Sequence, residues 1–389
     1  MDSEHRLLEI AQRVVAIRRD LHAHPELAFA EQRTADLVAN RLEGLGLTTY
    51  RGIAGTGVVA HLRCGSSERA IGLRADMDAL PLEELNAFAH RSRHQGCMHA
   101  CGHDGHMAML LGAAEALAVA PHFDGSVYFI FQPAEEHEGG GRLMVEQGLF
   151  QRFPMQAVFG LHNWPGLAAG QMAVMPGAVM AGADRFDIRV IGRGGHAAMP
   201  QQAADSVVAG AALVTALQTL VSRNTEPLEP AVLSVTRFHA GHADNVLPER
   251  AELGGTLRSF SAAQQVLMEA GMRRVCDGIA AAYGVLIELK IERGYPPTIN
   301  APLETALCRE VASQVLGTEN VRADLRPSMG AEDFSYMLQA RPGCYVWLGN
   351  GMGEGGCLLH SPRYDFNDDI ILLGMRYWLG LVDRALAPV

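Results

Sequence analysis

The stretch Ala70-Ile-Gly-Leu-Arg-Ala-Asp76-Met-Asp78 shows how this chain is organised. It begins as an apolar, strand-like run, and two carboxylates follow where that strand would end. Other strand-like runs cover residues 57–62, 127–132, 157–161 and 344–349. Helical patterns cover residues 7–21, 33–45, 104–120 and 303–315. Strands spaced by helices in this way predict an α/β domain with a mostly parallel sheet.

A different order of elements begins near residue 183. Strand-like runs at 185–191, 232–238, 252–258 and 285–292 are interspersed with helical patterns at 204–221 and 262–283. The order β-α-β-β-α-β is typical of a compact ferredoxin-like α+β module. We therefore predict a catalytic domain in two parts, residues 1–182 and 294–389, with a second domain inserted over residues 183–293.

The composition narrows the class of protein. Of the 389 residues, 48% are hydrophobic and 19% are charged, which is typical of a globular chain. A net charge of −11 argues against nucleic acid as a partner, because an acidic surface repels phosphates.

The cysteines and the N-terminal segment indicate the cellular compartment of the protein. The seven cysteines form an odd, scattered set, which favours reduced thiols over a disulfide framework. The N-terminal segment shows no apolar core of a signal peptide, and the most apolar stretch, residues 108–120, is too short to span a membrane. We expect a cytoplasmic enzyme without a membrane partner.

Residues that can bind metals follow the predicted strand ends or precede the helix at residue 104. They are Asp76, Asp78, Cys101, His103, Glu135, Glu136, His162 and His360. In open α/β sheets, ligands bind beyond the carboxyl ends of the strands. Thiolate, imidazole and carboxylate donors together suit zinc, manganese, cobalt or nickel. One of the adjacent glutamates could bind a metal while the other acts as a general base.

Eight motifs extend this pattern over nearly the whole chain. They are Arg18-Arg-Asp-Leu-His-Ala-His-Pro-Glu26, Leu73-Arg-Ala-Asp-Met-Asp78, Met98-His-Ala-Cys-Gly-His-Asp104, Phe131-Gln-Pro-Ala-Glu-Glu136, Gly160-Leu-His-Asn163, Gly192-Arg-Gly-Gly-His196, Gly330-Ala-Glu-Asp-Phe334 and His360-Ser-Pro362. In this order they resemble the hippurate hydrolases, N-acyl-amino-acid amidohydrolases and related carboxypeptidases, a branch of the cocatalytic dinuclear zinc-type metallopeptidases (the aminoacylase-carboxypeptidase family).

The resemblance implies a phosphorylase/hydrolase-like catalytic domain that binds two divalent metal ions, manganese, zinc, cobalt or nickel. The residues that match the family's metal ligands are Cys101, His103, Glu136, His162 and His360. Glu135 matches its general base, and Asp78 matches the carboxylate that orients the metal centre.

The inserted domain matches the family's lid and dimerisation domain, which implies a homodimer or homotetramer. His196 matches a histidine that contacts the scissile carbonyl, in some relatives across a dimer interface. Asn245 and Arg258 match lid residues that hold the substrate's carboxylate or carbonyl. For Arg258 a salt bridge within the lid is the alternative.

One motif departs from the wider superfamily, whose other branches carry His-x-Asp where this chain has Asp76-Met-Asp78. In this branch His103 supplies the imidazole instead, and Cys101 replaces a bridging carboxylate. Two roles stay open for Asp76: it supports the metal ligands from outside the metal site, or it only stabilises the fold. Glu332 and Asp333 could line the site or cap a helix.

The implied activity is hydrolysis of the amide bond of an N-acetyl or N-benzoyl amino acid by a metal-bound water, with Glu135 as the general base. The partner is then a small N-acyl amino acid or a short peptide. The alternatives are a dipeptidase or carboxypeptidase, an N-acetyl-diaminopimelate-type deacetylase, and a non-catalytic metal-binding protein.

Overall fold

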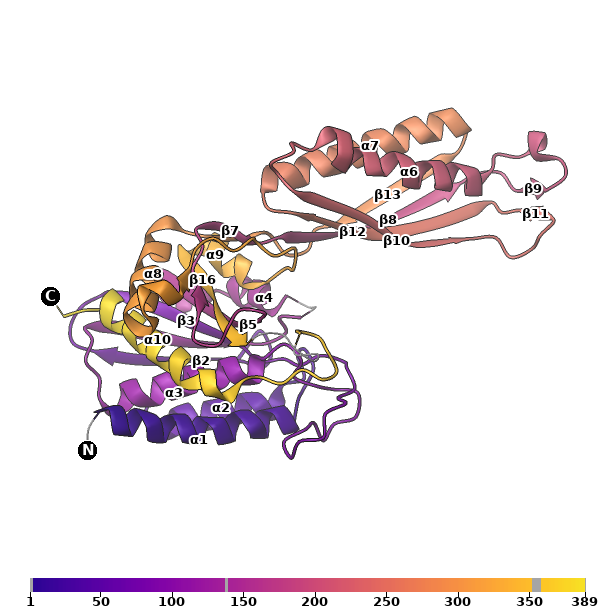
Figure 1. The fold of residues 1–389 in the computed structure, drawn as a ribbon. Helices are drawn as coiled ribbons and strands as arrows, with labels where there is room; N and C mark the ends of the chain where they lie inside the picture. The colour runs from indigo at the N-terminus through magenta and orange to yellow at the C-terminus, as the bar shows by residue number, and fades with distance from the viewer. Residues whose placement is uncertain (1–2, 137–138, 352–357, 389) are drawn as a thin grey trace. The chain divides into compact units, whose positions relative to one another are not determined.

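The computed structural model describes residues 3–136, 139–351 and 358–388. The chain forms two compact units, and Figure 1 shows the elements of each. The first unit comprises Met1–Gly177, Ile299–Arg326 and Asp333–Val389, and the second comprises Ala178–Thr298 and Pro327–Glu332. The insertion expected over residues 183–293 lies within the second unit. The segment Pro327–Glu332 also belongs to this unit by its contacts, although the sequence pattern put it in the catalytic domain.

An eight-stranded sheet forms the centre of the first unit, in the order β1-β2-β4-β3-β5-β16-β6-β15. The strands are β1 (Thr48–Ile53), β2 (Gly57–Cys64), β3 (Ala70–Asp76), β4 (Gly125–Gln132), β5 (Ala157–Pro165), β6 (Met172–Ala173), β15 (Val321–Arg322) and β16 (Gly343–Gly351). The central pairs β4-β3, β3-β5 and β5-β16 are parallel, which confirms the predicted sheet. At one edge β1 and β2 pair antiparallel, because the connection between them is too short for a crossover.

Helices cover both faces of this sheet (Figure 1). They are α1 (Ser3–Ala23), α2 (Gln32–Gly44), α3 (His103–Val119), α4 (Gly140–Glu146), α5 (Leu149–Arg152), α8 (Pro302–Leu316), α9 (Phe334–Ala340) and α10 (Ile371–Ala385), with short 3-10 helices at Thr318–Asn320 and Asp368–Ile370. Residues of α1, α2, α3, α8 and α10 share one hydrophobic core with the strands. Every residue of β3 and β4 is buried, as expected of strands covered on both faces.

The second unit has the predicted order β-α-β-β-α-β. Its elements are β8 (Gly182–Ile191), β9 (Gly195–His196), a 3-10 helix (Pro200–Gln202), α6 (Ser206–Asn224), β10 (Ala231–Ala240), β11 (Val246–Leu247), β12 (Arg250–Ser259), α7 (Ala262–Tyr283) and β13 (Leu286–Glu292). The antiparallel sheet order β10-β12-β8-β13 places the first and last long strands side by side. Burial alternates along β8, as expected of a sheet covered on one face. Two short strands, β7 (Gly177–Met180) and β14 (Thr298–Asn300), pair with each other.

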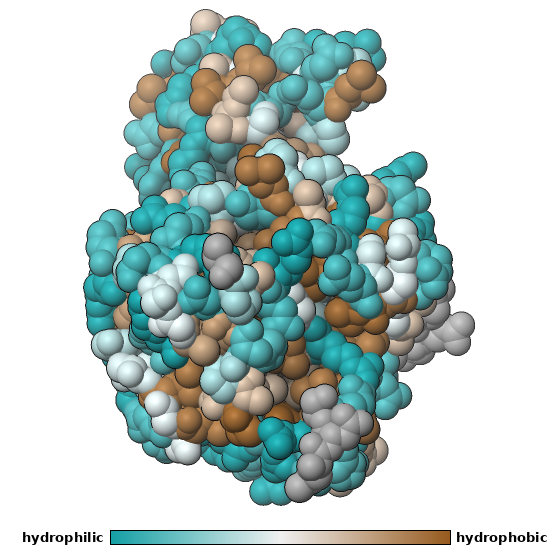
Figure 2. Space-filling view, turned by 90° about the vertical axis from the view of Figure 1, so that its left-hand side faces the viewer, coloured by the Kyte–Doolittle hydropathy of each residue, from teal (hydrophilic) through white to brown (hydrophobic). Residues whose placement is uncertain are grey.

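Among the described residues, one helix, α6, is long and apolar enough to cross a membrane by length and composition. Its Leu213, Leu217 and Leu220 are buried in the core of the second unit, so that core accounts for part of its apolar character. On the face of the molecule seen in Figure 2, hydrophobic residues lie in separate groups among hydrophilic ones. Isolated apolar groups of this kind are normal on folded proteins.

Candidate metal centre and active site

The five predicted metal ligands lie in one cluster of the first unit. The Sγ atom of Cys101 lies 3.4 Å from Nε2 of His162. The Nε2 atom of His103 lies 3.9 Å from Oε1 of Glu136, and Nε2 of His360 lies 3.4 Å from the same oxygen. Donor atoms of Cys101, Glu136 and His360 all lie within 4.8 Å of one another. The fold thus gathers donors from the start of α3 and the residues just before it, from β5, and from the segments that follow β4 and β16.

The chemistry of the cluster fits divalent metal ions. Nε2 of His103 and Oε1 of Glu136 are buried without a hydrogen-bond partner among the described residues. Burial, Glu136 and Glu135 raise the pKa of the Cys101 thiol well above its usual value. A divalent cation would satisfy the unpartnered atoms and favour the thiolate.

Main-chain carbonyl groups set the orientation of two imidazole rings. Nδ1 of His103 lies 2.8 Å from the carbonyl oxygen of Asp78, and Nδ1 of His162 lies 2.6 Å from that of Asn163. Because a carbonyl oxygen only accepts, each Nδ1 must carry a proton and donate it. Both rings therefore direct Nε2 to the cluster, as in metal-binding histidines whose other nitrogen is hydrogen-bonded.

The Asp78 carboxylate fixes the two adjacent glutamates. Its Oδ1 accepts a hydrogen bond from the main-chain N–H of Glu135 at 3.0 Å, and its Oδ2 accepts one from that of Glu136 at 3.0 Å. Asp78 is 1% exposed, so solvent hardly competes for these bonds. This geometry supports the predicted role of Asp78 as the residue that orients the centre.

Two residues of the site have left-handed backbone conformations that are uncommon outside glycine. Ala134, which precedes Glu135, has a φ of 54°, and His360 has a φ of 61°. The main-chain N–H of Ala134 donates to Oε1 of Glu31 at 2.9 Å, and that of His360 donates to the carbonyl of Ala100 at 2.7 Å. Such conformations persist where the surroundings hold them, and they are concentrated at functional sites.

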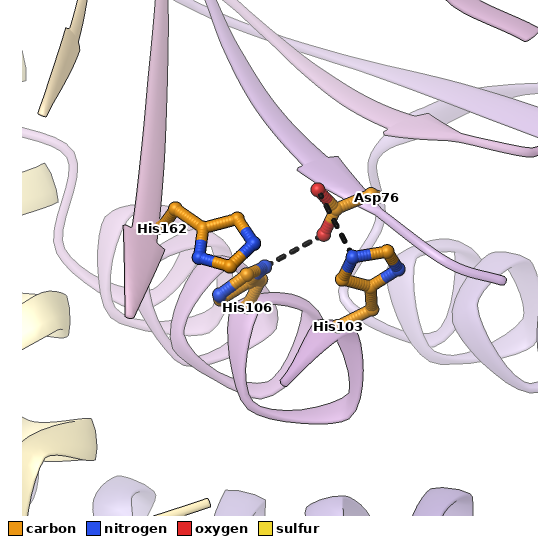
Figure 3. Close-up of side chains that lie close together, drawn as sticks. All are labelled: Asp76, His103, His106 and His162. Carbon is orange, nitrogen blue, oxygen red and sulfur yellow. Dashed lines mark hydrogen bonds and ion pairs between the residues drawn. The ribbon is translucent and has the colours of Figure 1, made fainter. Parts of the chain in front are cut away.

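Sequence reasoning missed His106, which lies one helical turn after His103. Figure 3 shows it beside Asp76, His103 and His162. Its Nδ1 lies 2.6 Å from Oδ1 of Asp76, and its Nε2 lies 2.7 Å from Oδ1 of Asn163. The spacing of three residues on one helix was the available signal. With both nitrogens engaged, His106 supports the ligand cluster and holds Asp76 beneath it.

A buried charge network anchors the start of α3, which carries His103. Oδ2 of Asp104 lies 3.0 Å from Nε of Arg18 and 2.8 Å from Nδ1 of His22, and these three side chains are fully buried. Burial lowers the pKa of His22, but its hydrogen bonds to Asp104 and Glu84 outweigh burial and raise that pKa to about 9. The network therefore contains a histidinium that ties α3 to α1 at neutral pH.

The three predicted substrate-binding residues all lie in the second unit, but at two separate places. His196, whose side chain is exposed, is in β9, which pairs with β11, and the carbonyl of Asn245 accepts a hydrogen bond from the residue after His196. Arg258 lies near the far end of β12, whose ten residues span roughly 30 Å. Within one copy of this unit, the structure brings His196 and Asn245 together and leaves Arg258 apart.

Arg258 makes few polar contacts within the described part of the chain. Among the described residues, no carboxylate lies within ion-pair distance of it, and Nη1 donates only a long 3.5 Å bond to the carbonyl of Met329. Burial and the neighbouring Arg185 lower the pKa of Arg258. The alternative of a salt bridge within the lid therefore finds no partner in the described part of the chain.

The chain is similar to proteins of one known family. Residues 72–384 match the profile of peptidase family M20/M25/M40. The hippurate hydrolase of Campylobacter jejuni is 40% identical over 380 residues, which cover 98% of each chain. The N-acyl-L-amino acid amidohydrolase of Geobacillus stearothermophilus is 45% identical over 294 residues, 75% of this chain and 79% of the relative. Thermostable carboxypeptidase 2 of Saccharolobus solfataricus is 37% identical over 373 residues, 94% of this chain and 93% of the relative.

A solved structure agrees in fold and in the kind of site. The YXEP protein of Bacillus subtilis, a dinuclear metal-binding peptidase of the M20 family, is 34% identical, with a TM-score of 0.85 over 98% of this chain and 99% of that one. The family resemblance and the prediction of a hydrolase that acts on amide or peptide bonds are confirmed. The chain therefore belongs to peptidase family M20/M25/M40, and it is a metal-dependent hydrolase of amide or peptide bonds.

Proposed function

We propose that this enzyme hydrolyses the amide bond of N-acyl amino acids, with Glu135 as its general base and two divalent metal ions held by the five-ligand cluster. The observation that carries the proposal is the pair of glutamates fixed by Asp78. The Glu136 carboxylate lies near the imidazoles of His103 and His360. Glu135 is 6% exposed, and one of its carboxylate oxygens lies within 4.8 Å of donor atoms of His103 and Glu136. Relatives named for hippurate and N-acyl-L-amino acids support this substrate class.

Different residues of the chain have different roles in the reaction. When bound, the metal ions supply the Lewis acidity that makes water nucleophilic near neutral pH. Glu135 accepts the proton of the attacking water and delivers it to the leaving amine. Asp78 holds the main chain at Glu135 and Glu136, which keeps the base close to the ligands for both proton transfers.

We infer that Arg258 recognises the carboxylate of the substrate through charge-assisted hydrogen bonds. The test compares hippurate with its amide, together with a panel of N-acetyl amino acids, N-benzoyl amino acids and dipeptides. We expect hippurate to be the better substrate and Arg258→Ala to lower its kcat/KM by roughly 10- to 100-fold, the effect of losing a charged hydrogen bond of about 1.5–3 kcal/mol. The exposed neighbour Arg185→Ala is the control. Equal rates for hippurate and its amide would remove carboxylate recognition, and a strong preference for dipeptides would favour the carboxypeptidase alternative.

We also propose a cytoplasmic homodimer formed through the second unit. The outer side of α6 exposes Val207 and Val208, and the helix carries no charged residue between Asp205 and Arg223. β10 is an edge strand of the sheet, and edge strands can pair with another chain. A dimer would allow Arg258 of one copy to act with His196 and Asn245 of the other. The six described cysteines are free, which agrees with a reducing compartment.

Sedimentation velocity tests the assembly. We expect the wild-type protein to sediment as a dimer, and Val208→Asp to sediment as a monomer because it places a charge on an apolar contact. Leu228→Asp, at an exposed position outside α6, is the control. A wild-type monomer would contradict the proposal, and a tetramer would show that a second interface exists.

A further inference from the structure

A second buried network lies beside the ligand cluster in the first unit, and Arg74 of β3 is at its centre. Arg74 is 1% exposed. Its Nη1 donates to Oδ2 of Asp76 at 2.7 Å, its Nε donates to Oε1 of Gln132 at 2.8 Å, and its Nη2 donates to Oδ1 of Asp333 at 3.2 Å. One guanidinium thus links the ends of β3 and β4 to the residue before α9.

The Asp333 carboxylate accepts hydrogen bonds from three different residues, and Asp333 is completely buried. Besides Arg74, its Oδ1 accepts from Nε2 of Gln132 at 2.6 Å. Its Oδ2 accepts from the main-chain N–H of Gly141, at the start of α4, at 2.7 Å. Asp333 stands at the N-cap position of α9, but its side chain makes no capping hydrogen bond to that helix.

These contacts hold both ends of the segment that carries the adjacent glutamates. That segment begins at Gln132 and ends at Gly141, and the Asp333 carboxylate binds both residues. The main-chain N–H of Asp333 also lies 3.4 Å from Oε1 of Glu135. Gly141 is needed for this approach, because a Cβ there would lie 2.9 Å from the carbonyl oxygen of Asp333 and 3.0 Å from its Oδ1.

We propose that Asp333 is a positioning residue for Glu135, whose loop it fixes at both ends while Asp78 fixes the middle. The inference rests on the proposed function, in which Glu135 is the general base. Asp333→Asn would turn an amide N–H₂ toward the donors of Arg74, Gln132 or Gly141 and would remove a counter-charge from the buried Arg74. Since a misplacement of about 1 Å can cost about 100-fold in rate, the loss should fall on the chemical step.

The experiment uses the metal-loaded, full-length enzyme with its best N-acyl amino acid. We expect Asp333→Asn to lower kcat by about 100-fold while KM and the metal content stay close to those of the wild type. Asp124→Asn is the control, because the Asp124 carboxylate likewise accepts main-chain N–H groups, in its case those of Ser66 and Ser67, but it lies at the opposite ends of the strands. An unchanged kcat, or a loss of metal in proportion to the loss of activity, would overturn the proposal.

Gly141→Ala disturbs the same contact through the partner of Asp333. It provides the test if Asp333→Asn does not fold. We expect it to lower kcat as well, and the double variant to lose less than the product of the two effects, since both act on one contact. Independent, multiplicative effects would contradict a shared anchor. If Glu135→Gln is active, the proposed function fails; if Glu135→Gln is inactive but both anchor variants are active, only the positioning role fails.

Discussion

Glu135→Gln is expected to lower kcat by roughly a thousandfold or more, the scale of a lost general acid-base catalyst. Glutamine keeps the shape of the side chain and the main-chain bond to Asp78, but it cannot take a proton from water. Metal content should stay at two ions per chain, measured by elemental analysis of the purified variant. The fall should appear in kcat and in kcat/KM alike, because the interaction is made in the transition state.

Glu136→Gln is the matched comparison for this experiment. It changes the same chemical group one residue further along, in a carboxylate that lies 3.4 Å from Nε2 of His360. We expect it to lose metal and activity together, while Glu135→Gln loses activity alone. An active Glu135→Gln variant would remove this residue from the base role, and a metal-depleted one would make it a ligand.

Removal of the metal ions should have an effect of similar size. We expect exhaustive dialysis against a chelator to abolish hydrolysis of every substrate, and one or more of manganese, zinc, cobalt and nickel to restore it. The buried donors of the cluster should also make the metal-free protein melt at a lower temperature. A ligand present at 100 times its dissociation constant stabilises the folded protein by about 2.7 kcal/mol.

Two comparisons separate metal chemistry from a general loss of structure. Circular dichroism should show that the metal-free protein retains its helix content. Of the five candidate ligands only Cys101 belongs to the hydrophobic cores of the two units, so these cores do not depend on the metal ions. Cys101→Ser should weaken binding of thiophilic zinc more than of manganese, which prefers oxygen ligands. Full activity of the metal-free enzyme would contradict the assignment of the cluster.

The candidate ligands could be found from the sequence because their signals are local. Each of Glu136, His162 and His360 follows a strand-like run, and the carboxyl ends of neighbouring parallel strands meet at one edge of a sheet. The inserted unit was predictable for a similar reason, since its order of strands and helices repeats a known module. The family motifs then distinguished Glu135 from Glu136, which the pattern of strand ends did not do.

The sequence by itself therefore determined the fold class, the family and the set of candidate ligands, all of which depend on short-range patterns. Only the tertiary structure decided what surrounds them: His106 holds Asp76, Asp333 holds the glutamate segment, and Arg258 lies far from His196 in one copy of the second unit. Those relations join residues up to 201 positions apart, as between Gln132 and Asp333. Hydrogen bonds at such separations depend on where the fold brings the strands and loops together, and no periodicity in the chain records them.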